Sequence, residues 1–344
     1  MRKEVLAVGC ALMVFCGCGK NNAAQHYESG WAAMEKKDYT TAVNEFQQVI
    51  DQNSRLAESY RAEGIAYYSE KAYPEAIAAF SRSLNNMDDP DKEFKKDVQF
   101  YLAQARMDYG EVDKAIEVYS EILKAGEDEQ AFFLRGKAYI SMEDYKNAEK
   151  DFQRALEGCE DYNLYINIYQ IYVDHNKAVD GDAYLKMALE LEPQDGEDCY
   201  HRGRIYEYEK NYEAARDELK TSMEQGYEDA MLLLGRVYLE MEDSPSARSM
   251  YQEYLQKSEQ GAKAYNGLAM CDIYDGAYDS ALENIAQGLK ENSKEDEQGL
   301  LYNEIVAYEY KRDFATAKEK MKIYLEQYPE DEAALRENEF LSTR

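Results

Sequence analysis

A spaced set of small and bulky apolar residues recurs along this chain, and it limits the available folds more than any other feature. In five segments a glycine is followed twelve residues later by an alanine, and four residues after that by a bulky apolar residue. The five sets are Gly30/Ala42/Phe46, Gly64/Ala76/Phe80, Gly136/Ala148/Phe152, Gly203/Ala215/Leu219 and Gly235/Ala247/Tyr251. Four weaker copies make nine, with 32 to 39 residues between successive starting points. A period of this length predicts stacked copies of one small unit, because each copy buries its apolar face only against its neighbours.

Each copy reads as two helices joined by a turn. Apolar residues recur at steps of three and four, which is the pattern of a helix with one buried stripe. Acids or amides stand where they can cap the second helix, as in Asp38-Tyr39, Asp144-Tyr145, Asn211-Tyr212 and Asp313-Phe314. We expect the glycine of the first helix to face the alanine of the second, so that the two backbones approach closely. The bulky residue would then cover the gap.

These residues and their spacing resemble the tetratricopeptide repeat (TPR), a helix-turn-helix unit of about 34 residues, over residues 23–329. The family's small residue is Gly or Ala in seven of the nine copies, and its alanine is present in eight. The resemblance implies an all-α fold, an α-solenoid that winds as a right-handed superhelix of nine units. Residues 330–344 read as a C-terminal capping helix. The stretch 226–235 also resembles the related Sel1-type repeat, a variant of the same architecture.

The first 17 residues differ from the rest of the chain and read as a signal peptide. Arg2 and Lys3 precede an apolar run from Val5 to Phe15. A short positive region followed by about 7–15 apolar residues is typical of a secretory signal. The sequence therefore predicts that the mature protein lies outside the cytoplasm.

The end of this signal resembles the Leu-small-small-Cys box of bacterial lipoproteins. Gly17 before Cys18 fits the box, whereas Phe15 and Cys16 depart from the usual Leu and small residue. The resemblance implies that Cys18 carries the lipid (a diacylglyceryl group and an acyl chain such as palmitate), with residues 18–22 as lipidated cysteine and tether. More than one acyl chain anchors a protein stably. An ordinary cleaved signal, or an uncleaved anchor, is the alternative.

The charge of the chain excludes one class of partner. Its 344 residues include 40 Lys and Arg against 69 Asp and Glu, for a net charge of −29. Such an acid excess repels the phosphates of nucleic acids, so no nucleic acid is expected among its partners. The chain is not predicted to be disordered, because 45% of its residues are hydrophobic.

The TPR resemblance also implies a concave groove, lined mainly by the first helix of each unit. The family's groove positions map onto 27 residues, of which only Glu28 is acidic. The candidate peptide-binding residues at these positions are Tyr27, Trp31, Arg61, Phe100, Phe133, Lys137, Asn167, Tyr200, His201, Arg204, Arg236, Asn266, Tyr302 and Asn303. Aromatic faces, amides and arginine forks suit an extended peptide and its carboxylates. The same scarcity of acids would also follow if these positions are partly buried between neighbouring helices.

Catalysis is not indicated. His26, His175 and His201 lack the spacing of metal ligands, and no nucleophile-elbow or phosphate-loop motif is present. The cysteines beyond the signal, at 159, 199 and 271, are odd in number and widely spaced, which fits neither a disulfide framework nor a zinc site. We therefore predict no enzyme activity, no cofactor and no metal site.

Together these features favour a scaffold or adaptor that is lipid-anchored to the bacterial cell membrane on its extracytoplasmic side. It would mediate protein–protein interactions at the cell envelope and hold extended peptide segments of its partners in the groove. The alternative is a surface receptor for a glycan or another solute, since the chain has 32 tyrosines. Sugar platforms usually carry more tryptophan than the single one found here.

The anchor prediction can be tested by replacing the lipidated cysteine. Cys18→Ala should abolish lipidation and release the protein from membranes into the soluble fraction, as measured by lipid labelling and membrane fractionation. Cys10→Ala serves as the control, because Cys10 lies inside the apolar run. A Cys18→Ala protein that stays membrane-bound would show that the cleavage site is wrongly assigned.

Overall fold

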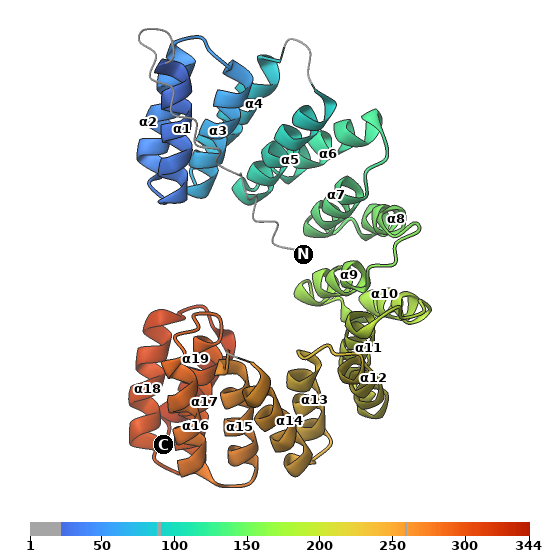
Figure 1. The fold of residues 1–344 in the computed structure, drawn as a ribbon, viewed down its shortest axis with the longest axis vertical. Coiled ribbons are helices and arrows are strands. Elements are labelled where there is room, and N and C mark those ends of the chain that lie inside the picture. Colours follow the sequence, from blue (N-terminus) through green and yellow to red (C-terminus); the bar gives the residue numbers. More distant parts are fainter. Residues whose placement is uncertain (1–21, 88–90, 259) are drawn as a thin grey trace. The chain divides into compact units, whose positions relative to one another are not determined.

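The computed structural model describes residues 22–87, 91–258 and 260–344 (Figure 1). The predicted signal peptide and Cys18 lie outside these residues. Within them, all regular structure consists of nineteen α-helices and no strand, which confirms the all-α prediction. The chain divides into two compact units, Met1–Asp182 and Ala183–Arg344, and the division falls within α10 (Ala178–Leu189).

The helices follow one another as helix-turn-helix pairs. In the first unit these are α1 (Asn22–Glu35) and α2 (Tyr39–Asp51), α3 (Leu56–Ser69) and α4 (Tyr73–Asn85), α5 (Lys92–Tyr109) and α6 (Val112–Ala125), and α7 (Glu129–Ser141) and α8 (Tyr145–Ala155). Then α9 (Tyr162–Asp174) precedes α10. The second unit continues with α11 (Gly196–Tyr208) and α12 (Tyr212–Glu224), α13 (Ala230–Glu240) and α14 (Ser244–Lys257), α15 (Ala262–Tyr274) and α16 (Tyr278–Lys290), and α17 (Glu297–Tyr310) and α18 (Phe314–Gln327). A last helix, α19 (Glu332–Ser342), packs on α18. The nine pairs confirm the predicted number of repeats.

The predicted helix caps are present. Asp38 accepts a hydrogen bond from the backbone N–H of Thr41 at 3.1 Å, and Asp313 accepts one from Thr316 at 3.2 Å. Equivalent caps form at Asp144 and Asn211. Each satisfies one of the N–H groups that the first turn of a helix leaves without a partner.

The turn within each pair has a backbone feature that the sequence did not reveal. Two residues before each second helix, φ is positive, between 57° and 88°. The nine residues are Lys37, Lys71, Gly110, Glu143, Asn176, Lys210, Glu242, Gly276 and Arg312. Only two of them are glycine, although a left-handed residue with a Cβ costs about 1–2 kcal/mol. The turn therefore depends on the packing of the two helices that it joins.

The repeated glycines make room for the bulky residue of the same unit. A Cβ built on Gly30 would lie 2.5 Å from the Phe46 ring, and one built on Gly64 would lie 2.6 Å from the Phe80 ring. The same holds for Gly136/Phe152, Gly203/Leu219 and Gly235/Tyr251, at 2.6–2.7 Å. The expectation that the bulky residue covers the gap over each of these glycines is thus confirmed, and at Gly203 the Ala215 carbonyl oxygen also lies 3.4 Å from the built Cβ. The alanines are fully buried, but the bulky side chain lies directly on the glycine.

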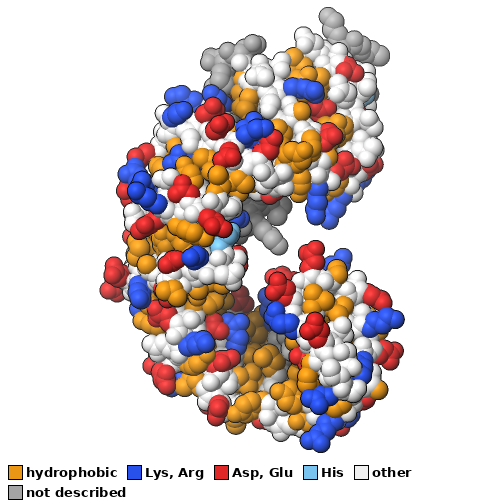
Figure 2. Space-filling model, turned by 180° about the vertical axis from the view of Figure 1, so that it is seen from behind, with side chains coloured by type: hydrophobic (Ala, Val, Ile, Leu, Met, Phe, Trp, Pro, Cys, Tyr) orange, Lys and Arg blue, Asp and Glu red, His pale blue; other side chains and the backbone are white. Residues whose placement is uncertain are grey.

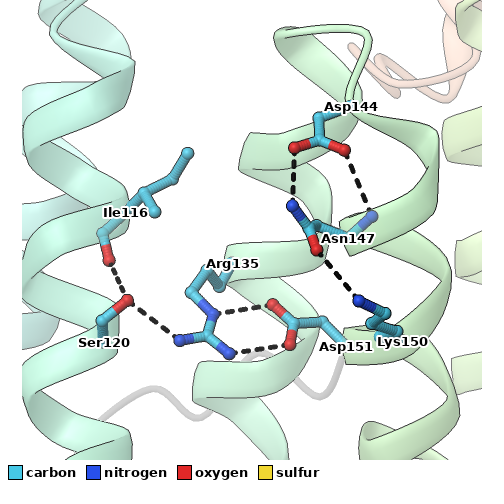
Figure 3. Close-up of polar contacts among 7 residues, drawn as sticks. All are labelled: Ile116, Ser120, Arg135, Asp144, Asn147, Lys150 and Asp151. Carbon is cyan, nitrogen blue, oxygen red and sulfur yellow. Dashed lines mark hydrogen bonds and ion pairs between the residues drawn. The ribbon is translucent and has the colours of Figure 1, made fainter.

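A second contact over the same sixteen-residue interval is ionic in some units. In Figure 3 the Arg135 guanidinium on α7 donates two hydrogen bonds, of 2.7 and 2.8 Å, to the Asp151 carboxylate on α8. It also donates to Ser120 Oγ on α6 at 2.9 Å, so one side chain ties three helices together. The bond to Asp151 raises the pKa of Arg135. Arg202 and Glu218 form the same pair across α11 and α12 at 2.9 Å.

The last unit keeps this pair with its charges exchanged. There Glu304 on α17 holds Lys320 on α18 at 2.8 Å. Where the position carries an ion pair, it therefore accepts either polarity. In the second repeat Glu63 occupies the corresponding place, with Ala79 opposite, and Glu63 Oε2 is buried without a hydrogen-bond partner. Burial accordingly raises the pKa of Glu63.

The glycine contact predicts the effect of adding one methyl group. Gly64→Ala should lower the stability of the chain by about 1–3 kcal/mol, the usual cost of overpacking a filled core, because its Cβ would meet the Phe80 ring. Combining Gly64→Ala with Phe80→Leu should recover part of the lost stability, because leucine is the residue that faces the glycine at Gly203/Leu219. Gly299→Ala is the control, since its Cβ would approach no atom closer than 3.4 Å. Equal denaturation midpoints for Gly64→Ala and Gly299→Ala would contradict this account.

Candidate functional site

In the second unit, the first helices of successive pairs border a hollow of about 460 Å³. Three of the predicted groove residues line it, namely Tyr200 on α11, Arg236 on α13 and Asn266 on α15. Lys263 of α15 and the turn at 293–296 before α17 complete much of its wall. Because most of its lining side chains carry polar groups, we call it the polar hollow.

A second hollow, of about 620 Å³, lies on the same helices. It is lined by Leu239 of α13, Ile273 and Tyr274 of α15, and Val306 and Tyr310 of α17, among others. We call it the apolar hollow. Tyr274 is 54% exposed and Tyr310 is 60% exposed, so two large rings face solvent here.

The two hollows meet at one residue of α15. Met270 lines both of them and is 39% exposed. Asn266 of the polar hollow accepts a hydrogen bond of 2.8 Å from the side-chain amide of Asn303, which lines the apolar hollow. We call the two hollows together the α13–α17 groove. Predicted residues at 200, 236 and 266 therefore line one hollow, and the predicted residue at 303 lines the hollow that meets it at Met270.

Two of the predicted arginines already hold a carboxylate of this chain. Arg236 Nη2 lies 2.9 Å from Glu207 Oε2, and Arg61 Nε lies 2.5 Å from Asp97 Oδ2. Arg61 also lies over the Tyr101 ring at 5.3 Å. A ligand carboxylate would have to compete with these ion pairs.

His201 and Arg204 contact each other and the ring of Tyr200. His201 is buried, at 6% exposure, and its Nδ1 lies 3.2 Å from Arg204 Nη1. The Arg204 guanidinium lies 5.8 Å from the centre of the Tyr200 ring. The Tyr200 ring also packs against the Tyr227 ring, with 5.0 Å between their centres, and burial raises the pKa of Tyr200. Of these residues only Tyr200 lines the polar hollow, so the predicted residues His201 and Arg204 lie outside its lining.

The predicted aromatic residues of the first unit pack against the repeated bulky residues. Tyr27 and Trp31 contact the Phe46 ring at 5.8 and 5.5 Å, and Phe133 contacts Phe152 at 6.1 Å. Phe100 likewise lies 6.4 Å from Tyr119. In the same unit Lys137 is exposed and Asn167 is half-buried. The half-burial of these aromatic rings agrees with the alternative that the mapped positions are poor in acids because they pack between helices.

Acidic residues reach the groove from positions that the sequence mapping did not include. Its described lining contains Asp229, Glu240, Glu242, Glu295 and Asp296, against two basic residues at 236 and 263. The mapping considered three positions of each first helix, whereas these acids lie at helix ends and in turns. On the face drawn in Figure 2, acidic and basic side chains are interspersed. The groove is thus acidic overall, although its mapped positions are not.

Two carboxyl groups meet at the end of the second unit. Glu309 on α17 lies beside Glu337 on α19, and Glu309 Oε1 is buried without a hydrogen-bond partner. Burial, followed by the adjacent Glu337 carboxyl, raises the pKa of Glu309 to about 7. The predicted groove residue Tyr302 packs on Tyr324 at 5.8 Å, and its pKa is raised by burial and by the same two acids. Protonation of Glu309 therefore favours the packing of α19 beside the groove.

Comparison with known proteins agrees with the repeat pattern. Tetratricopeptide repeat family models match residues 27–91 and 232–297, and a further tetratricopeptide repeat model matches residues 129–161. The chain is a tetratricopeptide repeat protein. No curated protein gave a significant match. Most residues that line the α13–α17 groove lie within the matched range 232–297, and the lining residues on α17 follow directly after it.

Several solved structures are similar to this TPR protein. One is a tetratricopeptide repeat protein from Parabacteroides merdae, with 16% identity over 83% of this chain and 99% of that chain and a TM-score of 0.46. Yeast Tom70 has 14% identity over 89% and 78%, with a TM-score of 0.49. YrrB, described as a TPR protein with an unusual peptide-binding site, has 25% identity over 55% and 97%, with a TM-score of 0.36. Since these TM-scores are below 0.5, the family assignment rests on the repeat matches.

The described residues contain neither a membrane-spanning helix nor a metal-binding group of side chains. No helix among residues 22–87, 91–258 and 260–344 is long and apolar enough to cross a membrane. In that same part of the chain, no group of three or more His, Cys, Asp or Glu side chains is arranged to hold a metal ion.

The raised pKa of Glu309 predicts a pH-dependent stability. The unfolded carboxyl ionises near pH 4.5 and the folded one near pH 7, so the stability that Glu309 contributes is fully present below pH 4.5 and is lost as the pH rises through 7. Glu309→Gln should remove this loss and raise the Tm at pH 8 by about 2–4 °C, the shift expected for 1 kcal/mol. At pH 4 the two proteins should melt alike.

Glu319→Gln is the matched control for this experiment, because Glu319 is exposed on α18. It removes the same charge without touching the Glu309–Glu337 contact. If Glu309→Gln and Glu319→Gln show the same pH profile as the unchanged protein, Glu309 does not titrate as described.

Proposed function

We propose that this TPR protein is a membrane-anchored scaffold of the bacterial cell envelope that binds extended peptide segments of its partners in the α13–α17 groove. TPR stacks act as protein–protein interaction scaffolds, and the family assignment supports this general role. The anchor and the location rest on the Cys18 signal, which lies outside the described residues. A lipid at residue 18 would precede the first helix by only a short tether.

The observation that carries the proposal is the continuity of the two hollows. Three side chains line the apolar hollow with 39–60% of their surface exposed, at Met270, Tyr274 and Tyr310. Large apolar side chains that gather in one depression are typical of a binding site. The Asn266–Asn303 amide pair lies between the hollows, where it can hydrogen-bond a peptide backbone.

The burial of the tyrosines favours a peptide over a glycan in the polar hollow. Tyr251 and Tyr254 line it, but they are only 4% and 8% exposed because their rings pack in the core. Such rings offer little face for a sugar to stack on. A peptide instead needs pockets for alternate side chains and polar groups for its backbone, and the groove supplies both.

The proposal can be tested by selecting binders from a random dodecapeptide display library with the purified protein. Met270→Glu should weaken the selected peptides at least about tenfold, a loss of about 1.4 kcal/mol, because it places a charge where the two hollows join. Met142→Glu is the matched control, since Met142 is also exposed, at 44%, and lies in the first unit. Binding that tolerates Met270→Glu, or that Met142→Glu weakens equally, would exclude this groove.

A further inference from the structure

The charges around the apolar hollow are of one sign. Among the described residues that line it, Glu240 at the end of α13 and Glu242 in the following turn are the charged ones, and no Lys or Arg contributes. Both glutamates are exposed. Glu240 accepts a hydrogen bond from the Tyr212 hydroxyl at 3.2 Å, which leaves its charge in place.

Basic residues close to this hollow are already engaged. Lys311, next to Tyr310, is ion-paired with Asp279. Arg248 on α14 holds Asp272 and Asp275 at 2.9 and 2.8 Å. Among the described ion pairs, none joins Glu240 or Glu242 to a basic residue, so their negative charge is not neutralised by such a pair.

The aromatic rings of the hollow suit a cation as well as an apolar group. Tyr278 and Tyr310 are stacked, with their ring centres 6.0 Å apart and their planes at 21°. Tyr274 and Tyr310 expose more than half of their surface. A lysine or arginine over such a ring is attracted by the negative face of its π-system, and a carboxylate nearby adds to the attraction.

The geometry points to a cationic peptide as the occupant of the α13–α17 groove, with an apolar side chain in the apolar hollow and Lys or Arg beside Glu240 and Glu242. This inference rests on the proposed function and adds the chemical class of the partner segment. It differs from the carboxylate-bearing peptide that the arginines at 61, 204 and 236 first suggested. The described groove lining, with five acids and two bases, favours positive side chains over negative ones.

The residue composition of selected dodecapeptides tests the inference. Peptides enriched by the unchanged protein should contain Lys or Arg within a few residues of a Tyr, Phe, Leu or Met. Their affinity should fall about tenfold or more when the salt concentration rises from 50 to 500 mM, because exposed charge pairs are screened. Glu240→Gln combined with Glu242→Gln should remove most of that salt dependence and weaken the binding of these peptides about tenfold.

Glu283→Gln combined with Glu319→Gln is the matched control. It neutralises two exposed acids on the second helices α16 and α18 and removes the same amount of negative charge. It should leave the affinity unchanged. Enrichment of neutral or acidic peptides that Met270→Glu still weakens would overturn the cationic preference and leave the proposed function standing. Failure to enrich any peptide would contradict both.

Discussion

In five of the nine repeats, the absence of one side chain sets how closely the two helices approach. A glycine on the first helix leaves a space that the bulky residue sixteen positions later fills, as Phe46 fills the space over Gly30. A Cβ there would lie within 3 Å of the ring, which no well-packed core accommodates. The two helices can therefore approach only in this register. The turn between them follows from that register, even where it forces a residue such as Lys210 to a positive φ.

The other positions on the helices either join neighbouring repeats or face solvent. Arg135 illustrates the first group, since it binds Asp151 in its own unit and Ser120 in the preceding one. The groove belongs to the second group. Rings such as Tyr274 and Tyr310 lie at the ends of the first helices, where more than half of their surface stays exposed. The proposed function thus rests on side chains that the repeat leaves uncovered.

Much of this arrangement could be predicted from the sequence because it repeats. The helix pairs follow from the spacing of glycine, alanine and bulky residues, and the caps follow from residues such as Asp38 and Asp313. The groove was less accessible to prediction. Asn266 and Asn303 stand at mapped positions, but Tyr310 and the acidic lining come from helix ends and turns, whose placement depends on how successive units stack. The ion pair of Arg236 with Glu207 is likewise a tertiary contact that spacing does not reveal.

Peptide binding where the two hollows join, at Met270, is the property on which the proposed function depends most. It can be tested by NMR of the protein labelled with ¹³C at its methionine methyl groups, during titration with a selected dodecapeptide. We predict that the Met270 resonance shifts in proportion to bound peptide, while those of Met142 and Met187, which are exposed elsewhere, remain unchanged. An unchanged Met270 resonance at saturation, with a shift at Met142 or Met187, would contradict this account.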